Sequence, residues 1–411
     1  MLDARFARTR DKLRTVAALS SDPVWRTCVT LSFAVSIAKS GALGGILQQF
    51  EWNVLQFGPI LVAIVWMILS NDSPALRKAD RFLIWAMVAV VATAVLSTIF
   101  SVSPATTIYQ SGVLAILTAF LLLTTMKRWD RRERIDSDLV LIFAIVSLNQ
   151  LFGLCAAALG AKWALGDYSR FVGTLSNANY AGMLSAVALA IGIHLVTLKR
   201  GAFRIVIGVG MAILAVAMLW SGSRGSLLAV VLGTVLVLGL RRAWRTLIAL
   251  LLIIVAAAAA IVVFMPGILS RVSNSDLTSG RVEIYESMIR NWLQRPVLGT
   301  GFRTAQLLPG NEGLAGHNIF LSVLTETGVL GFISFLAVLV AVCLCGRGNS
   351  MAGAAATVII IELTESSIYG WGGPTSTISW LALMSYAALG RSNSSRSEAI
   401  ARAETEHSQA S

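Results

Sequence analysis

The chain has 411 residues, of which 56% are hydrophobic and only 13% are charged, and its mean hydropathy is +0.75. Soluble domains carry about 25% charged residues, so this composition excludes an ordinary water-soluble globular protein. The formal net charge is +12, but basic and aromatic residues are not interleaved on any segment outside the apolar runs, which argues against a nucleic-acid-binding protein.

The first 26 residues form a basic tail that precedes the first long apolar segment. Five of its six basic residues lie between Arg5 and Arg14. No small-residue cleavage site follows, so we expect a cytoplasmic tail and not a cleavable signal peptide.

Apolar segments close to the roughly 20 residues that a membrane-spanning helix needs recur along the rest of the chain. The sequence therefore predicts an all-α integral membrane protein with about twelve transmembrane helices, nine within residues 27–265 and three within residues 318–390. The predicted spans are 27–46, 54–70, 82–100, 106–125, 139–160, 179–198, 203–220, 225–240, 246–265, 318–345, 351–368 and 375–390.

Lysine and arginine are distributed asymmetrically between the predicted loops. With both termini in the cytoplasm, 24 of the 33 basic residues lie on the inner side and eight on the outer side. This bias follows the positive-inside rule, and the inner residues would contact anionic membrane lipid. We therefore expect a multi-pass membrane protein with both termini in the cytoplasm, ending in a disordered tail over residues 391–411.

One predicted outer loop, residues 266–317, is far longer than the others. Thr278 or Ser279 can cap a short helix that runs to about Arg295 and is ended by Pro296. Its predicted apolar face carries Val282, Tyr285, Met288, Ile289 and Trp292. The sequence thus predicts a large periplasmic loop that contains short helical structure.

Arg170, Arg224 and His317 lie near the outer ends of predicted helices, and Arg281 lies in the long outer loop. A positive charge beside a short outer hairpin opposes the topology signal, so Arg170 and Arg224 need a reason to be there. Guanidinium groups bind phosphate oxygens through two hydrogen bonds, and a neutral imidazole accepts a proton near pH 7. These groups suit transfer of a group from a pyrophosphate to a hydroxyl, and a lipid-linked glycan is a donor available at that membrane face.

The sequence offers no obvious metal site or cofactor motif. The acids of the long loop are scattered and do not form a cluster that would hold Mg²⁺. The four cysteines have no zinc-site spacing. We therefore expect metal-independent chemistry without a cofactor.

Each candidate also has a purely structural alternative. Arg224 can extend to lipid headgroups, Arg170 can pair with Asp167, Arg281 can be a solvated helix residue, and His317 can cap the following helix. Asn177 and Asn179 can be caps of the sixth span. The acids Glu362 and Glu365 can simply neutralise Lys39 or Arg224. The other outer arginines, Arg271, Arg290, Arg295 and Arg303, are expected to be ordinary solvated or headgroup-binding residues.

Several motifs occur together in a characteristic order. They are "WSGSRGS" (220–226), "SGR" (279–281) opening a helix, "LGTGF" (298–302) and "HNIFLSVLTETGVLGF" (317–332). This series resembles the O-antigen ligase/polymerase superfamily, bacterial membrane glycosyltransferases that include O-antigen ligases, exopolysaccharide polymerases and protein O-oligosaccharyltransferases. "RFVGTLSNANYAG" (170–182) resembles the family's Gly-Thr-x-x-Asn-x-Asn stretch, with Ala178 where the family commonly has proline.

The resemblance implies a helical bundle in the bacterial inner membrane, with a periplasmic loop of short helices. It also implies a glycosyltransferase that moves glycan from undecaprenyl pyrophosphate to a hydroxyl on the periplasmic side. The acceptor would be lipid A core or growing polysaccharide, with a protein acceptor ranked third. The family's conserved arginines match Arg224 and Arg281, and its loop histidine matches His317. We expect these three to be catalytic. The expected substrate-binding residues are Arg170, Asn177, Asn179, Asn318 and Glu326.

The alternative from another class is a transporter or flippase of a lipid-linked anionic glycan. Such a protein would place its essential polar groups near the middle of the membrane, whereas the candidates here gather at the predicted outer face.

Overall fold

The computed structural model describes residues 23–40, 49–69, 76–198, 200–240, 281–309, 316–366, 368 and 373–410. Within these ranges the chain folds into twelve α-helices with short 3-10 turns, and its only β-type pairing is an isolated bridge between Leu165 and Phe171. The predicted ninth span, residues 246–265, and the predicted N-terminal tail up to residue 22 lie outside the described residues.

The all-α fold class is confirmed, and the protein crosses the membrane several times. Seven of the described helices are long and apolar enough to span a bilayer, and two further apolar helices, α9 and α14, are shorter. The seven are α3 (Gln49–Leu69), α4 (Lys78–Leu96), α5 (Pro104–Leu123), α6 (Arg132–Ala158), α7 (Ala178–Leu198), α8 (Ala202–Ser221) and α13 (Ile319–Cys345). The other five are α2 (Pro23–Ser40), α9 (Arg224–Leu240), α12 (Arg281–Gln294), α14 (Ala352–Thr364) and α15 (Pro374–Ala410).

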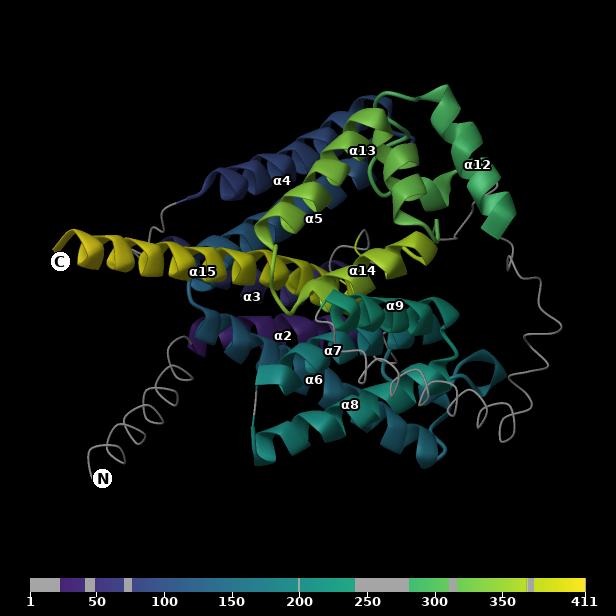
Figure 1. The fold of residues 1–411 in the computed structure, drawn as a ribbon. Helices are drawn as coiled ribbons and strands as arrows, with labels where there is room; N and C mark the ends of the chain where they lie inside the picture. Colours follow the sequence, from purple (N-terminus) through teal and green to yellow (C-terminus); the bar gives the residue numbers. More distant parts are fainter. Residues whose placement is uncertain are drawn as a thin grey trace.

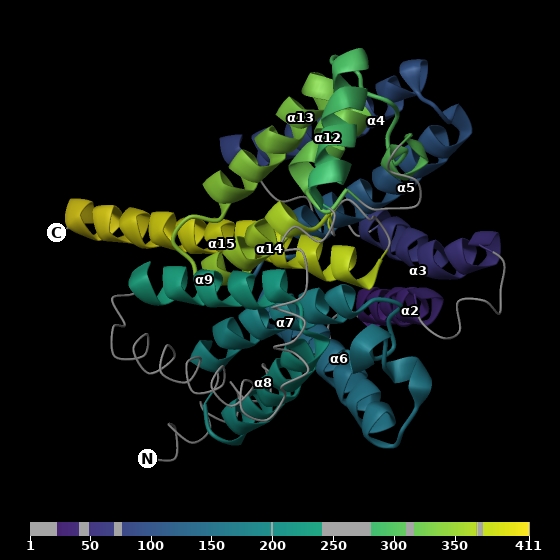
Figure 2. The same ribbon diagram turned by 90° about the vertical axis from the view of Figure 1, so that its right-hand side faces the viewer.

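The helices form two groups on either side of a central helix. In one group α4 packs against α13, and α12 lies over one end of α13 (Figure 1). In the other, α7 packs against α6, α8 and α9. The first part of α15 runs between them and contacts α6, α7, α13 and α14 (Figure 2). The site described below therefore has walls from both groups.

Helix α7 is the most deeply buried of the candidate membrane spans. It is rich in alanine and glycine, and small residues allow helix backbones to approach closely within a membrane. At Gly182 an added Cβ would lie 2.5 Å from the Cβ of Ser223 and 2.7 Å from the Oγ of Ser221. This close approach places the "SGSRG" turn before α9 directly against the start of α7.

Helix α13 is interrupted where the glycine-rich loop meets it. Gly328 has φ 66° and ψ −168°, a conformation that interrupts the helical path and that only glycine adopts readily. The loop donates backbone hydrogen bonds to the exposed carbonyls, from Thr300 to Thr325 O and from Gly301 to Glu326 O, both at 2.9 Å. The "LGTGF" and "TETG" motifs therefore fit against each other through their backbones.

Three segments differ in detail from the sequence-based expectations. The loop helix α12 has nearly the expected bounds, but its buried side chains are Ile284, Ser287 and Met288, while Val282 and Ile289 of the predicted face are exposed. Helix α14 ends at Thr364, earlier than the predicted span that reached residue 368. Helix α15 continues to Ala410 through the segment whose composition predicts disorder.

Candidate active site

A single acidic side chain, Glu365, joins residues from three distant parts of the chain. It is the first residue after α14 and has an extended backbone. One carboxylate oxygen, Oε1, lies 3.1 Å from a terminal guanidinium nitrogen of Arg281 and accepts a 3.0 Å hydrogen bond from Asn179 Nδ2. The other, Oε2, lies 2.9 Å from His317 Nδ1. Exposed side-chain fractions of 10% for Glu365, 29% for Arg281 and 26% for His317 show that solvent still reaches this cluster.

The neighbouring residues fix the position of His317. Its φ is 46°, in the left-handed region that non-glycine residues rarely adopt. The Tyr285 hydroxyl on α12 donates to the His317 carbonyl at 3.1 Å. The next residue, Asn318, caps α13 by accepting from the Leu321 amide at 3.1 Å and also donates to Leu363 O on α14. The start of α13 and the end of α14 are thereby tied together beside the imidazole.

Arg170 and the two asparagines extend the Glu365 network toward α7. Arg170 donates from Nε to Ser221 O and from a terminal nitrogen to Asn179 Oδ1, each at 2.7 Å. Asn177 Oδ1 accepts from the Asn179 amide at 2.7 Å and thus caps the start of α7. Asn179 therefore bridges Arg170 to Glu365, which is more than the helix-capping role considered for it.

Arg224 lies at the first position of α9, next to this network. Its neighbour Gly225 approaches Thr364 so closely that an added Cβ would lie 2.5 Å from Thr364 Oγ1. Thr364 immediately precedes Glu365. The Arg224 side chain is exposed and, within the described part of the chain, forms no hydrogen bond or ion pair. Its guanidinium is therefore available to a ligand that binds beside the Glu365 network.

Glu326 has different partners from the other candidate residues. Its carboxylate is buried and accepts backbone hydrogen bonds from Arg303 at 2.6 Å and from Ala305 at 2.9 Å. These bonds hold the loop that follows the "LGTGF" motif. The geometry therefore supports a loop-anchoring role for Glu326, and the expected contact with substrate stays a prediction.

Three arginines lie at or next to the Glu365 carboxylate. Arg281 pairs with it, Arg170 is joined to it through Asn179, and Arg224 lies at the adjacent start of α9. Burial raises the pKa of the Tyr285 phenol, an effect that the Arg281 guanidinium opposes and the Glu365 carboxylate reinforces. A partly exposed cluster of arginines favours an anionic ligand that can share hydrogen bonds with several guanidinium groups.

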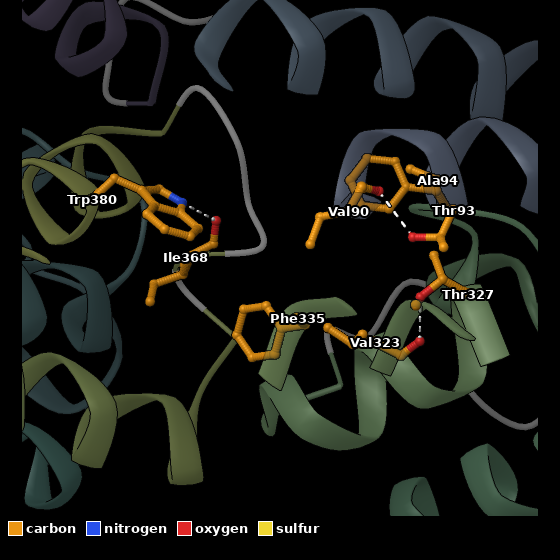
Figure 3. Close-up of a pocket in the computed structure, with 10 residues that line it drawn as sticks. Val90, Thr93, Ala94, Val323, Thr327, Phe335, Ile368 and Trp380 are labelled. Carbon is orange, nitrogen blue, oxygen red and sulfur yellow. Dashed lines mark hydrogen bonds between the residues drawn. The ribbon is translucent and has the colours of Figure 1, made fainter. Parts of the chain in front are cut away.

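An apolar pocket between α4 and α13 lies close to the site. Figure 3 shows Val90 and Thr93 of α4 facing Val323, Thr327 and Phe335 of α13, with Ile368 and Trp380 on a further side. Both threonine hydroxyls donate to carbonyls of their own helices, so they add little polarity. Phe302 also lines the pocket, next to the Glu326-anchored loop, and Ile368 follows Glu365 by three residues.

Sequence reasoning missed the central role of Glu365. It interpreted this acid as a counter-charge for Lys39 or Arg224, whereas its carboxylate binds Arg281 and His317. The available signal was an acid inside an apolar segment, which is costly unless it is paired. Its partners lie 48 and 84 residues away in the sequence, so no local pattern identified them.

The second described histidine, His194, belongs to a separate cluster near the other end of α7. Its Nδ1 lies 2.6 Å from Ser350 Oγ and its Nε2 lies 3.2 Å from Asp136 Oδ1. Among the described residues no group of three or more histidine, cysteine, aspartate or glutamate side chains is arranged to hold a metal ion.

Comparison with known proteins places part of the chain in a family. Residues 209–336 match the family model described as O-Antigen ligase, under a third of the chain, and this segment includes Arg224, Arg281 and His317. No curated protein matches the chain. Residues 209–336 of this multi-pass membrane protein therefore form an O-antigen ligase family domain.

Proposed function

We propose that the chain is a metal-independent membrane glycosyltransferase that moves a glycan from undecaprenyl pyrophosphate to an acceptor hydroxyl on the periplasmic side of the bacterial inner membrane. The observation that carries the proposal is the Glu365 carboxylate, which holds His317 and Arg281 side by side. The family match supports the same class of substrate, a lipid-linked glycan.

In this mechanism His317 removes the proton of the acceptor hydroxyl. Because Nδ1 lies against the Glu365 carboxylate at 2.9 Å, the proton of a neutral imidazole is stabilised on Nδ1, and the lone pair of Nε2 is free to act as base. The acceptor oxygen bonds to the anomeric carbon as the bond from that carbon to the phosphate oxygen breaks. The proton ends on Nε2, and the imidazolium is stabilised by Glu365.

The arginines stabilise the charge that develops on the leaving pyrophosphate. Arg224 has no partner among the described residues, and Arg281 shares its carboxylate with His317 and Asn179. Both can turn toward phosphate oxygens. Arg170 supplies a third cation, which Ser221 and Asn179 hold in place through hydrogen bonds.

The proposed orientation follows from the two ends of α7. Asn179 at its start contacts Glu365, whereas His194 near its end contacts Asp136, in the basic 126–138 segment. These residues are about 22 Å apart along the helix at 1.5 Å per residue. The site therefore lies away from the lysine- and arginine-rich loops, which the positive-inside rule places in the cytoplasm. Both termini would then be cytoplasmic.

The test uses purified protein in detergent with an undecaprenyl-pyrophosphate glycan and two acceptors, lipid A core and free repeat unit. We expect product with one acceptor, and a roughly 10²–10³-fold loss of turnover in Arg224→Ala and His317→Ala, as for removal of other preorganised charge stabilisers. Arg290→Ala is the matched control, because Arg290 is an exposed arginine on α12. A transporter or flippase would make no product without a sealed membrane, so absence of product with both acceptors overturns the proposal.

A further inference from the structure

The loop after "LGTGF" holds Arg303 in an unusual conformation at the edge of the site. Arg303 has φ 62°, one of three non-glycine residues with positive φ in the described chain, and another is His317. The Arg303 amide donates to Glu326 Oε2 at 2.6 Å, and the Ala305 amide donates to Oε1 at 2.9 Å. A left-handed backbone is unfavourable for arginine, and the two hydrogen bonds to the buried Glu326 carboxylate hold the loop in that conformation.

Arg303 interacts electrostatically with the start of α7. The hydroxyl of Tyr180 lies within electrostatic range of both the Arg303 guanidinium and the Glu365 carboxylate. Tyr180 follows Asn179, the residue that donates to Glu365. Arg303 is therefore a neighbour of the Glu365 network, although it comes from a loop that the sequence interpretation treated as an ordinary solvated segment.

Arg303 is half-buried, yet in the described ranges its guanidinium makes no hydrogen bond or ion pair. The comparison with Arg281 is informative, because that residue is committed to Glu365 at 3.1 Å. Arg303 therefore carries a partly desolvated guanidinium whose five donors are uncommitted within the described ranges, near the arginines of the Glu365 network. Such a group can bind an anion.

We propose that Arg303 is a further substrate-binding residue, whose guanidinium binds a phosphate oxygen of the lipid-linked donor, and that Glu326 is the positioning residue that directs it there. This inference rests on the proposed function. Phe302 lines the apolar pocket and Arg303 follows it directly. The same loop therefore carries an apolar side chain at the pocket and a cation near the Glu365 network.

The first experiment measures binding of undecaprenyl pyrophosphate to the purified full-length protein, which needs no turnover. Arg303→Ala should weaken binding roughly 10- to 100-fold, the range expected for loss of hydrogen bonds to a charged group. Arg303→Lys should recover part of the affinity, because a lysine keeps the charge but loses the planar fork. Arg290→Ala, the exposed control on α12, should bind as the wild type does.

Equal affinity of Arg303→Ala and wild type overturns the inference and leaves the proposed function intact, since Arg224 and His317 are tested separately. Failure of the wild-type protein to make product from either acceptor overturns the proposed function whatever the binding result. In the turnover assay, Arg303→Ala should raise the KM for the donor more than it lowers kcat.

The role of Glu326 is tested by Glu326→Gln, which keeps one acceptor oxygen for the loop amides. It should raise the KM for the donor in the same direction as Arg303→Ala. If Glu326 acts through Arg303, the double variant should bind undecaprenyl pyrophosphate no more weakly than the worse single variant. Additive losses would show that Glu326 affects the site by another route and would overturn its positioning role. Thermal unfolding of each variant separates this effect from general loss of folded protein.

Discussion

His317 Nδ1 lies 2.9 Å from Glu365 Oε2, and this contact joins the entry to α13 with the exit from α14. The second oxygen of the same carboxylate holds Arg281 of α12. One acid thus sets the tautomer of the proposed base and the position of a proposed phosphate ligand. Changes at Glu365 should therefore alter proton transfer and charge stabilisation together.

Glu365→Gln should reduce kcat by roughly 10²–10⁴-fold, the range over which positioned acid–base groups contribute. The amide cannot stabilise an imidazolium, and its nitrogen would oppose either Arg281 or His317. The measurement is product formation at saturating donor. Glu283→Gln is the control, because Glu283 is an exposed acid in the first turn of α12. A Glu365→Gln enzyme with wild-type kcat would contradict the proposed role of the carboxylate.

Tyr285→Phe removes the hydrogen bond to the His317 carbonyl and should have a smaller effect. Such a bond contributes about 0.5–1.5 kcal/mol net, so we expect kcat to fall by up to about tenfold. The comparison is between the two proteins at saturating donor and equal expression. A loss as large as that of His317→Ala would mean that Tyr285 contacts substrate directly.

The hydrogen bond between Tyr285 and His317 also predicts how pH affects the activity difference between the wild type and Tyr285→Phe. Burial raises the pKa of Tyr285 above its ordinary value of 10.0, so the folded state favours the protonated phenol. Its hydrogen bond is then fully present below the ordinary pKa and is lost only as pH rises through the higher folded value. The activity ratio of wild type to Tyr285→Phe should be constant from about pH 6 to about pH 9. A ratio that falls within this range would contradict the assignment.

Gly328→Ala should destabilise the fold because the backbone there has φ 66° and an added Cβ would lie 2.2 Å from Val297 O. The backbone conformation alone accounts for on the order of 1–3 kcal/mol, and the glycine-rich loop would have to move. Thermal unfolding in detergent is the measurement. Gly112→Ala in α5 is the matched control, since nothing lies within 4 Å of its added Cβ, and it should be neutral or slightly stabilising.

The elements that the sequence predicted well are those defined by local signals. The loop helix was predicted to begin after Thr278 or Ser279 and to end before Pro296, and α12 spans Arg281–Gln294. Membrane helices such as α7 and α8 match their predicted spans closely, because long apolar runs are themselves the signal. Where a boundary depends on capping or proline chemistry a few residues away, the sequence contains the cause.

The features that the sequence did not predict depend on contacts between residues that are far apart in the chain. Glu365 leaves the helical path of α14 where it meets Arg281 of α12 and His317, which precedes α13. Glu326 faces the amides of a loop 21 and 23 residues earlier in the chain, and nothing in a helical apolar run indicates which carboxylate will turn toward a loop. The electrostatic interaction of Arg303 with Tyr180 depends on how this loop folds, and the sequence does not indicate that fold.

A final prediction concerns Asp138, which joins three elements at the end of the bundle away from the site. Its side chain is fully buried and accepts hydrogen bonds from Arg128 at 2.7 and 2.8 Å, from Trp129 at 3.0 Å and from Arg26 at 3.2 Å. The guanidinium of Arg128 also lies 4.3 Å from the ring centre of Trp25. Asp138 therefore offsets a buried cation and ties α2 to α6.

Asp138→Ala would leave Arg128 buried without its carboxylate, which costs about 3–5 kcal/mol for comparable buried pairs. We expect a clear fall in the unfolding temperature in detergent and reduced protein in the membrane. Asp130→Ala removes an acid from an exposed pair with Arg134. Such a pair contributes about 0–1 kcal/mol to the free energy of unfolding. This variant should therefore unfold as the wild type does. Similar unfolding temperatures for the two variants would mean that water or lipid reaches Arg128 and that the pair is not sealed from solvent. Because the proposed active site lies at the opposite end of α7, the Asp138→Ala protein that does fold should retain the wild-type KM for the donor.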